Sequence, residues 1–234
     1  MSIKVILFDL DGTLLPMDQD EFVKAYMGSL TKKMMNYGYE PNKLMKSVWE
    51  GTRAMVKNDG TKKNMDVFWE LFYQLYGEDV KKDEKHFEEY YQNEFEYAKN
   101  ACGYQPKVPQ LISDLKEKYR LVLATNPLFP SIATQKRIGW AGLKPDDFEF
   151  YTTYENSYHC KPNVAYYQDI LEALNVNAQE CLMVGNDVSE DMIASSLGMK
   201  VFLLTDCLIN KDDADISIYP HGNIDDLIAY INQL

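Results

Sequence analysis

The sequence lacks a cysteine pair typical of metal sites and lacks any long apolar run. Its four cysteines are far apart, so neither a CxxC metal site nor a disulfide framework is supported. They are Cys102, Cys160, Cys181 and Cys207. The first apolar run, Val5 to Phe8, has four residues, whereas a membrane-spanning helix needs about 20. We therefore expect no signal peptide, no membrane segment and a cytoplasmic location.

Positive charge is also scarce. The 234 residues include 24 Lys and Arg against 36 Asp and Glu, a formal net charge of −12. Since binding to duplex nucleic acid requires a basic surface, no nucleic-acid partner is expected. The 12 Gly and 9 Pro are too few for a collagen-like or low-complexity chain, and 46% hydrophobic residues can form a substantial core. Residues 16–105 carry a net charge of −3 and the remainder −9, which indicates two parts with different roles.

The apolar pattern changes its period near residue 18. Before it, residues 4–8 predict a buried strand that ends at Asp9. After it, Phe22, Tyr26, Leu30 and Met34 recur every four residues, as on one face of a helix. Similar patterns predict three further helices, which begin near residues 41, 65 and 83. Residues 18 to about 101 are therefore expected to be wholly helical.

Beyond Gly103, helices and strands are expected to alternate. The predicted helices cover residues 108–118, 130–138, 163–174, 189–197 and 223–232. The predicted strands cover residues 120–124, 149–153, 181–184, 200–204 and 215–218. Such alternation predicts an α/β protein with a doubly wound parallel sheet. Residues 1–16 plus 104–234 would form this core, and residues 17–103 would form an inserted all-helical domain.

Polar side chains occur where the predicted strands end. The residues at these positions, with one lysine before a helix, are Asp9, Asp11, Thr125, Asn126, Asn186, Asp187, Asp191 and Lys161. Because the carboxyl ends of parallel strands lie at one edge of the sheet, we expect these side chains to converge on one crevice. Clustered carboxylates repel each other unless a hard cation lies between them. The pattern therefore predicts a Mg²⁺ site that, with the lysine, accepts a phosphoryl group.

Four segments, in this order, resemble motifs of the haloacid dehalogenase (HAD) superfamily. They are Asp9-Leu10-Asp11-Gly12-Thr13-Leu14, Thr125-Asn126, Lys161-Pro162 and Gly185-Asn186-Asp187 through Asp191. The resemblance covers the whole chain, and the first motif is its most specific part. A helical insert directly after that motif is similar to the type-one cap of the superfamily.

The resemblance implies a role for each matched residue. Asp9 would be the nucleophile, and Asp11 would act as general acid and then as general base. Thr125 and Asn126 would bind phosphoryl oxygens, and Lys161 would stabilise the charge on Asp9 and the phosphoryl group. An aspartate at position 11 is the pattern of phosphatases and phosphomutases, since dehalogenases of the superfamily lack an acid there.

The resemblance also implies a Mg²⁺ site, formed by Asp9, Asp11 through its main-chain carbonyl, and an acid of the fourth motif. That motif commonly begins Gly-Asp, whereas here Gly185 is followed by Asn186. We expect Asp187 to bind the metal, because a carboxylate binds a hard cation better than an amide does, with Asn186 as the alternative. Asp191 would be a second ligand or would orient one.

The helical insert contains one basic cluster. Arg53, Lys57, Lys62 and Lys63 surround a predicted turn at residues 58–61. They could form a substrate loop that reaches the crevice, although a solvated loop between two helices is the simpler interpretation. His159 and Cys160 precede Lys161 and are expected to be incidental.

These patterns predict a Mg²⁺-dependent phosphatase that hydrolyses a phosphate monoester of a small metabolite through an aspartyl-phosphate. A phosphomutase of the β-phosphoglucomutase type would share every core residue. A signalling phospho-acceptor, or a binding protein that kept the fold without catalysis, is an alternative of another class. The expected assembly is a monomer or a small homo-oligomer.

Overall fold

The computed structural model describes residues 2–234 and contains one six-stranded sheet in which every strand pair is parallel. Its strands lie in the order β3-β2-β1-β4-β5-β6. They are β1 (Val5–Phe8), β2 (Arg120–Leu123), β3 (Phe150–Tyr151), β4 (Cys181–Gly185), β5 (Lys200–Leu204) and β6 (His221–Gly222). The chain crosses over β1 between β3 and β4, so the crevice at the carboxyl ends of β1 and β4 is a topological switch point. The predicted doubly wound α/β fold is confirmed.

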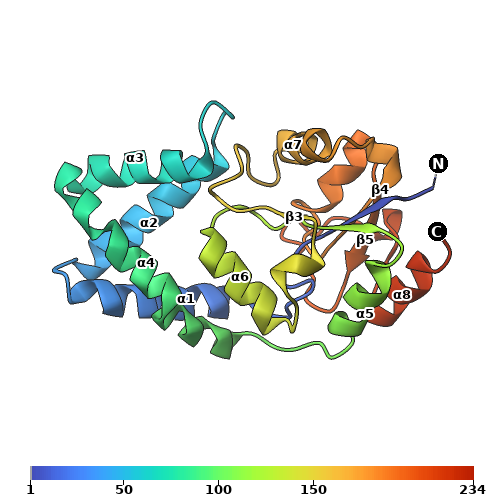
Figure 1. Cartoon of the computed structure of the whole chain (residues 1–234), viewed down its shortest axis with the longest axis horizontal. Helices are drawn as coiled ribbons and strands as arrows, with labels where there is room; N and C mark the ends of the chain where they lie inside the picture. Colours follow the sequence, from blue (N-terminus) through green and yellow to red (C-terminus); the bar gives the residue numbers. More distant parts are fainter. Residues whose placement is uncertain (1) are drawn as a thin grey trace.

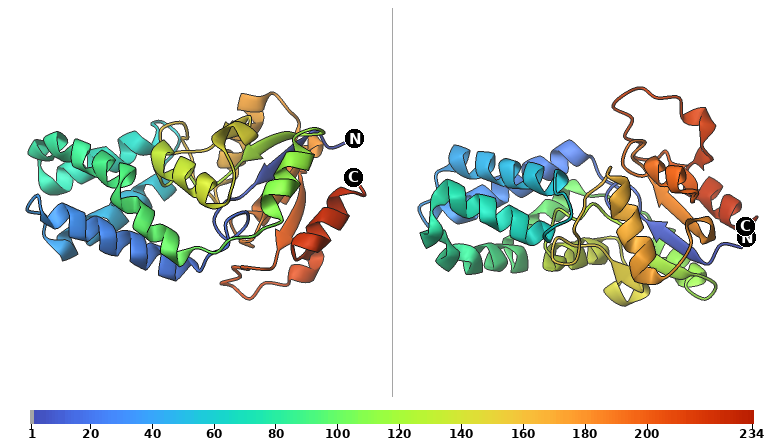
Figure 2. Two further views of the ribbon diagram at one scale, coloured as in Figure 1. Left: turned by 60° about the horizontal axis from the view of Figure 1, so that its bottom comes forward. Right: turned by 90° about the horizontal axis from the view of Figure 1, so that it is seen from above.

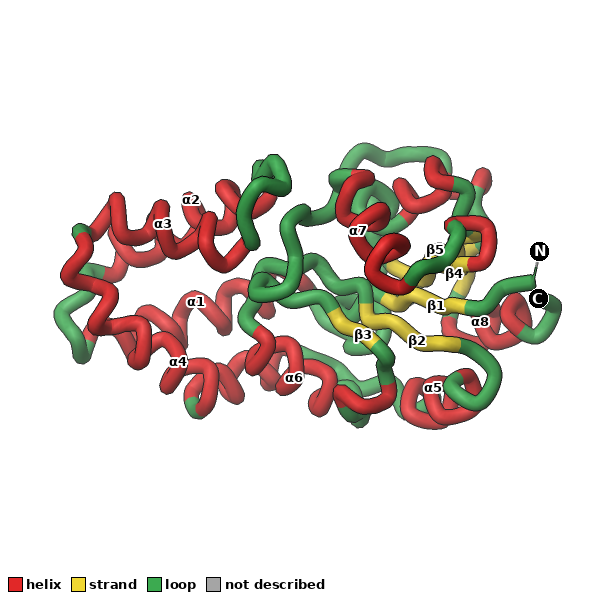
Figure 3. Tube along the Cα trace, turned by 45° about the horizontal axis from the view of Figure 1, so that its top comes forward, coloured by secondary structure: helices red, strands yellow, loops and turns green. Residues whose placement is uncertain are grey.

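Helices cover both faces of the sheet, as Figure 3 shows. The side chains of β1 alternate, so that Val5 and Leu7 pack with α7 (Val164–Leu174), while Ile6 and Phe8 lie in the core of α5 and α8. Helix α5 covers Val108–Leu115 and α8 covers Ile224–Ile231. Strand β1 is completely buried, which explains why its sequence reads as a continuous apolar run rather than an alternating one.

Two predicted elements differ in the structure. The helix expected at residues 189–197 is a 3₁₀ helix, Met192–Leu197. The strand expected at residues 215–218 is wrong: Ile216–Ile218 is a 3₁₀ helix whose first turn is capped by Asp215, and the edge strand is β6. Asp215 accepts a hydrogen bond from the Ser217 amide, which bends the chain before it can pair with β5.

The helical insert lies at the opposite end of the molecule from the C-terminus (Figures 1 and 2). Its α-helices are α1 (Gln19–Met35), α2 (Pro41–Val56), α3 (Asn64–Tyr76) and α4 (Glu84–Gln92), followed by the 3₁₀ helix Glu94–Ala101. Asp18 caps α1 and Pro41 begins α2, as their residue types predict. Among residues 2–234, no helix has the length and apolar character needed to cross a membrane.

Two neighbouring segments join the insert to the sheet domain. Met17 and Cys102 form an antiparallel bridge, and the Gly103 amide donates to the Pro16 carbonyl at 2.7 Å. Helix α6 (Ser131–Trp140) follows β2 and lies beside the insert (Figure 1). The chain thus enters and leaves the insert at one place, directly beyond the loop that carries Asp9 and Asp11.

Candidate active site

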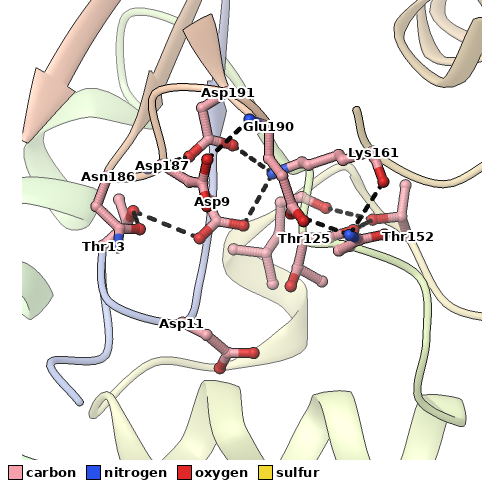
Figure 4. Close-up of polar contacts among 12 residues, drawn as sticks. Asp9, Asp11, Thr13, Thr125, Thr152, Lys161, Asn186, Asp187, Glu190 and Asp191 are labelled. Carbon is pink, nitrogen blue, oxygen red and sulfur yellow. Dashed lines mark hydrogen bonds and ion pairs between the residues drawn. The ribbon is translucent and has the colours of Figure 1, made fainter. Parts of the chain in front are cut away.

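A buried lysine bridges two aspartates at the carboxyl end of β1. The Lys161 ammonium lies 2.9 Å from Asp9 Oδ1 and 2.6 Å from Asp191 Oδ1, and its side chain is only 1% exposed (Figure 4). Asp9 follows β1 directly, and its amide donates to the Val184 carbonyl of β4. Three of the predicted site residues, from three separate segments, are therefore in direct contact.

Charge and burial act against each other in this cluster. Burial disfavours the ammonium, but the charges of Asp191 and Asp9 outweigh this effect and raise the pKa of Lys161 well above its ordinary value. Burial raises the pKa of Asp9, while Lys161 opposes that rise. Lys161 consequently stays protonated at neutral pH, so a fixed positive charge lies beside Asp9.

The loop after β1 makes a close turn against the end of β4. Gly12 has a φ of 84°, and a side chain there would collide with the Asn186 amide. The Thr13 hydroxyl donates to Asn186 Oδ1 at 2.8 Å and lies 3.5 Å from Asp9 Oδ2. Asn186 Nδ2 donates to the Cys207 carbonyl, which fixes the orientation of the amide. The carbonyl oxygen of Asn186 therefore faces the Asp9 loop.

The two aspartates of the fourth motif have other partners. Asp187 Oδ1 accepts bonds from the Ser189 amide and hydroxyl and from the Glu190 amide. Asp191 Oδ1 binds Lys161, and its Oδ2 accepts from the Asp187 amide at 3.0 Å. The turn donors therefore satisfy Asp187 Oδ1 alone, whereas both oxygens of Asp191 have partners, and the predicted metal set stays a prediction. The geometry favours Asn186 over Asp187 as the residue that faces Asp9.

Asp11 points away from Lys161 toward α6 (Figure 4). Its Oδ2 forms an ion pair with Arg137, which is 1% exposed and also contacts Thr134 and the ring of Phe129. Burial raises the pKa of Asp11, and the Arg137 charge lowers it in turn. Asp11 Oδ1 is buried without a hydrogen-bond partner among residues 2–234. Asp9 and Asp11 thus have separate cationic partners, which allows them different protonation states.

Thr125 and Asn126 follow β2 at the same edge of the sheet. Thr125 is buried, and its carbonyl accepts a bond from the Tyr166 hydroxyl at 2.9 Å. Asn126 Nδ2 donates to Glu190 Oε2 at 2.9 Å, and burial raises the pKa of Glu190 to about 7. Asn126 Oδ1 is buried without a partner within the described residues.

The donor atoms beside Asp9 fit Mg²⁺. Asp9 Oδ2 and Asn186 Oδ1 both lie within 3.5 Å of the Thr13 hydroxyl, and the Asp11 main-chain carbonyl accepts no hydrogen bond found in residues 2–234. Mg²⁺ takes one or two protein carboxylates, with water and phosphate oxygens as its other ligands. No group of three or more His, Cys, Asp or Glu side chains in the described chain could hold a metal. That result is compatible with this set, because only one of its donors is an acidic side chain.

A cavity between the insert and the sheet domain is lined by Asp11, and none of the four residues of the basic cluster of the insert lines it. Arg53 forms an ion pair with Glu50, and Lys62 forms one with Glu70. Lys57 is also exposed and Lys63 half-buried, which supports the solvated-loop interpretation. His159 Nδ1 lies 2.7 Å from Asp169 Oδ2 of α7.

Sequence reasoning missed three residues at or near the site. Arg137 and Glu190 contact Asp11 and Asn126, as described above. Asn64 is fully buried, and its Nδ2 lies 3.2 Å from Cys160 Sγ, directly before Lys161. Arg137 could have been found, because it shares a helix face with the buried Ala133 and Thr134.

The sequence matches one family model over residues 3–196, that of the haloacid dehalogenase-like hydrolases. No curated protein sequence matches the chain. Three solved structures illustrate the similarity of the fold, each at 20% sequence identity. A 2-haloacid dehalogenase from Pseudomonas syringae has a TM-score of 0.65, with 99% of both chains covered.

A HAD phosphatase from Thermococcus onnurineus has a TM-score of 0.59, with 98% of both chains covered. A HAD-hydrolase from Bacillus subtilis, described as bound to magnesium, has a TM-score of 0.58, with 99% of this chain and all of that chain covered. At this level of identity, these structures show the shared fold and leave the reaction to be argued from the site.

Proposed function

Because the chain belongs to the haloacid dehalogenase-like hydrolase family and is therefore a hydrolase, we propose that it hydrolyses a phosphate monoester of a small metabolite through an aspartyl-phosphate on Asp9. One observation carries the proposal: Asp9 and Asp11 lie two residues apart but contact different buried cations, Lys161 and Arg137. A dehalogenase needs the first carboxylate alone. The second has a buried Oδ1 without a hydrogen-bond partner in residues 2–234, and this atom suits transfer of a proton to an alcohol.

In the first step, the Asp9 carboxylate attacks the phosphorus atom and the bond from phosphorus to the alcohol oxygen breaks. Asp11, protonated, gives its proton to that oxygen, so that the alcohol leaves neutral. Burial favours the protonated form of Asp11 and supports this role. Lys161 compensates the negative charge that Asp9 brings to the phosphoryl group.

In the second step, Asp11 acts as the base. Having lost its proton, it accepts one from a water molecule, whose oxygen attacks the phosphorus of the aspartyl-phosphate. The bond from phosphorus to the Asp9 oxygen breaks, which restores the carboxylate and releases inorganic phosphate. Arg137 stabilises the ionised form of Asp11 between the two steps.

Mg²⁺, bound through Asp9, the Asp11 carbonyl and Asn186, would neutralise charge on the phosphoryl oxygens. Thr125 and Asn126 would hold those oxygens from the β2 side, and Asp191 would position Lys161. Residues 17–103 would form a cap over the crevice that excludes bulk water during the reaction.

The test is phosphate release from a panel of phosphate monoesters with Mg²⁺. We expect turnover that a chelator abolishes and that Asp9→Asn reduces to background. Asp18→Asn is the matched control, because it makes the same change at an exposed helix cap, where asparagine caps as well as aspartate does. Activity that survives Asp9→Asn or chelation would contradict the proposal. Transfer of the phosphoryl group to a sugar rather than to water would identify a phosphomutase instead.

A further inference from the structure

A cavity of about 370 Å³ lies between the helical insert and the loop after β2. Asp11 and Asn126 line its inner end, and side chains of α1, α2, α3 and α4 form most of the wall, together with sheet-domain residues such as Phe129 and Tyr154. An organic group bonded to a phosphoryl group at Asp9 would extend past Asp11 into this space. In the proposed mechanism, the alcohol portion of the substrate would therefore bind in this cavity.

The walls of the cavity are mostly apolar and aromatic. Helix α1 contributes Phe22, Val23 and Met27, and α3 contributes Phe68 and Trp69. On α2, Trp49 lines the cavity and is 42% exposed, so part of its ring faces water. Apolar surface that faces water in a concave site is stabilised when an apolar ligand covers it.

The charged groups of the cavity are predominantly acidic. Asp11, Asp20 and Glu190 line it, whereas Lys211 is the one basic residue among the described lining residues. A second phosphate or a carboxylate on the substrate would find Lys211 as its one cationic partner among the described lining residues, and Asp20 and ionised Glu190 would repel it even while Asp11 is protonated. The structure therefore disfavours anionic organic groups, such as those that carry a carboxylate or a second phosphate.

The inner end of the cavity also has too few buried polar atoms to bond the several hydroxyl groups of a sugar. Asp11 Oδ1 and Asn126 Oδ1 are the two lining atoms that are buried without a hydrogen-bond partner in residues 2–234. Asp11 is assigned to the leaving oxygen, which leaves Asn126 Oδ1 as the one buried acceptor without a partner at that end; other polar lining residues, such as Gln19 and Thr52, lie on α1 and α2. A polyhydroxylated sugar would bury several hydroxyls against aromatic rings, at a cost for each one.

We propose that this cavity binds an uncharged, mainly aliphatic or aromatic organic group, so that the substrate is the phosphate ester of an apolar alcohol. This inference rests on the proposed function. The cavity is more than twice the roughly 150 Å³ of an apolar cavity that binds benzene. It has room for a two-ring aromatic group or a medium-length alkyl chain.

The experiment compares n-alkyl phosphates from ethyl to octyl, which share the same leaving-group chemistry. We expect kcat/KM to rise about fourfold for each added methylene until the cavity is filled. Glucose 6-phosphate and phosphoglycolate, which are also alkyl esters, should be slower than hexyl phosphate. A rate that is independent of chain length, or highest for either polar ester, would overturn the inference and leave the proposed function intact.

A matched pair of variants locates the effect. Val23→Asn places an amide in the cavity wall, whereas Val56→Asn makes the same change on α2, where the side chain is 38% exposed and does not line the cavity. We expect Val23→Asn to lower the octyl-to-ethyl ratio of kcat/KM at least threefold, roughly the value of one methylene. Val56→Asn should leave the ratio unchanged. An equal effect of both variants would overturn the assignment to this cavity.

Binding of 2-naphthol, measured by calorimetry, separates the two proposals. It should bind the Asp9→Asn protein, and Val23→Asn should weaken that binding. If 2-naphthol binds in this way but no ester is hydrolysed, the proposed function is wrong and the apolar character of the cavity is supported. If hydrolysis occurs without 2-naphthol binding, the inference is overturned and the proposed function is kept.

Discussion

The ion pair between the buried Arg137 and the partly buried Asp11 allows a quantitative prediction. Replacing Arg137 by Met keeps most of the side-chain volume but leaves the Asp11 carboxylate buried without its cation. The loss of one partner of a buried ion pair costs about 3–5 kcal/mol, because the remaining charge is uncompensated. Bonds to Thr134 and to the Ala133 carbonyl are lost as well.

Urea unfolding in the presence of a chelator measures this effect. We expect Arg137→Met to lower the free energy of unfolding by about 3–5 kcal/mol. The double variant Asp11→Asn/Arg137→Met should be more stable than the single Arg137→Met variant, because no charge remains buried. Arg53→Met is the control: its exposed ion pair with Glu50 is worth about 1 kcal/mol or less.

A kinetic consequence accompanies the change in stability. The Arg137 charge lowers the pKa of Asp11, so its removal should raise that pKa and move the alkaline limb of the kcat/KM profile, which requires protonated Asp11, to higher pH. Arg137→Lys keeps the charge and should move it less. The reasoning would be refuted if the free energy of unfolding of Arg137→Met were within about 1 kcal/mol of the wild-type value. It would also be refuted if the effects of Asp11→Asn and Arg137→Met on that free energy were additive.

Two further predictions concern the lysine cluster. Lys161→Met should lower kcat at least about a hundredfold and destabilise the fold. Adding Asp191→Asn should recover part of the stability, since Asp9 stays unpaired, but none of the lost kcat; recovery of kcat would contradict the role of Lys161 at Asp9. Burial raises the pKa of Glu190 from 4.5 to about 7, so its ionisation opposes folding above pH 7 and has no effect below about pH 4.5. In thermal unfolding, Glu190→Gln should therefore stabilise the protein at pH 8, by at most about 3 kcal/mol, and less at pH 5; a pH-independent difference would refute the assignment.

Much of the fold could be predicted from the sequence, because the buried strands and amphipathic helices have distinct periods. Strand β1 was found from its apolar run, and α1 from the four-residue spacing of its buried side chains. The short edge strand could not be predicted, because β6 owes its two residues to pairing with Leu203 and Leu204 rather than to strand-forming side chains. Ile216–Ile218 alternates like a strand but is bent by the Asp215 cap.

The part of the site that could be predicted consists of residues whose charge and position after a strand indicate one role. Asp9 and Lys161 are in contact as expected. The metal ligands of the fourth motif remain a prediction, and the structure shifts the preference from Asp187 to Asn186 for a local reason. Three donors in the turn satisfy one Asp187 oxygen, while the close approach of Gly12 turns Asn186 toward the first motif. Such competition for hydrogen bonds depends on three-dimensional geometry and cannot be read from residue type.

The central claim is that Asp9 carries the phosphoryl group and Asp11 provides its release to water. The most direct measurement is the time course of p-nitrophenol release from p-nitrophenyl phosphate by Asp11→Asn with Mg²⁺, since this leaving group needs no general acid. The account predicts a burst of about one p-nitrophenol per protein molecule followed by slow turnover, with the phosphoryl group retained on Asp9, and no burst for Asp9→Asn/Asp11→Asn. Steady turnover by Asp11→Asn at the wild-type rate, or a burst that persists without Asp9, would contradict it.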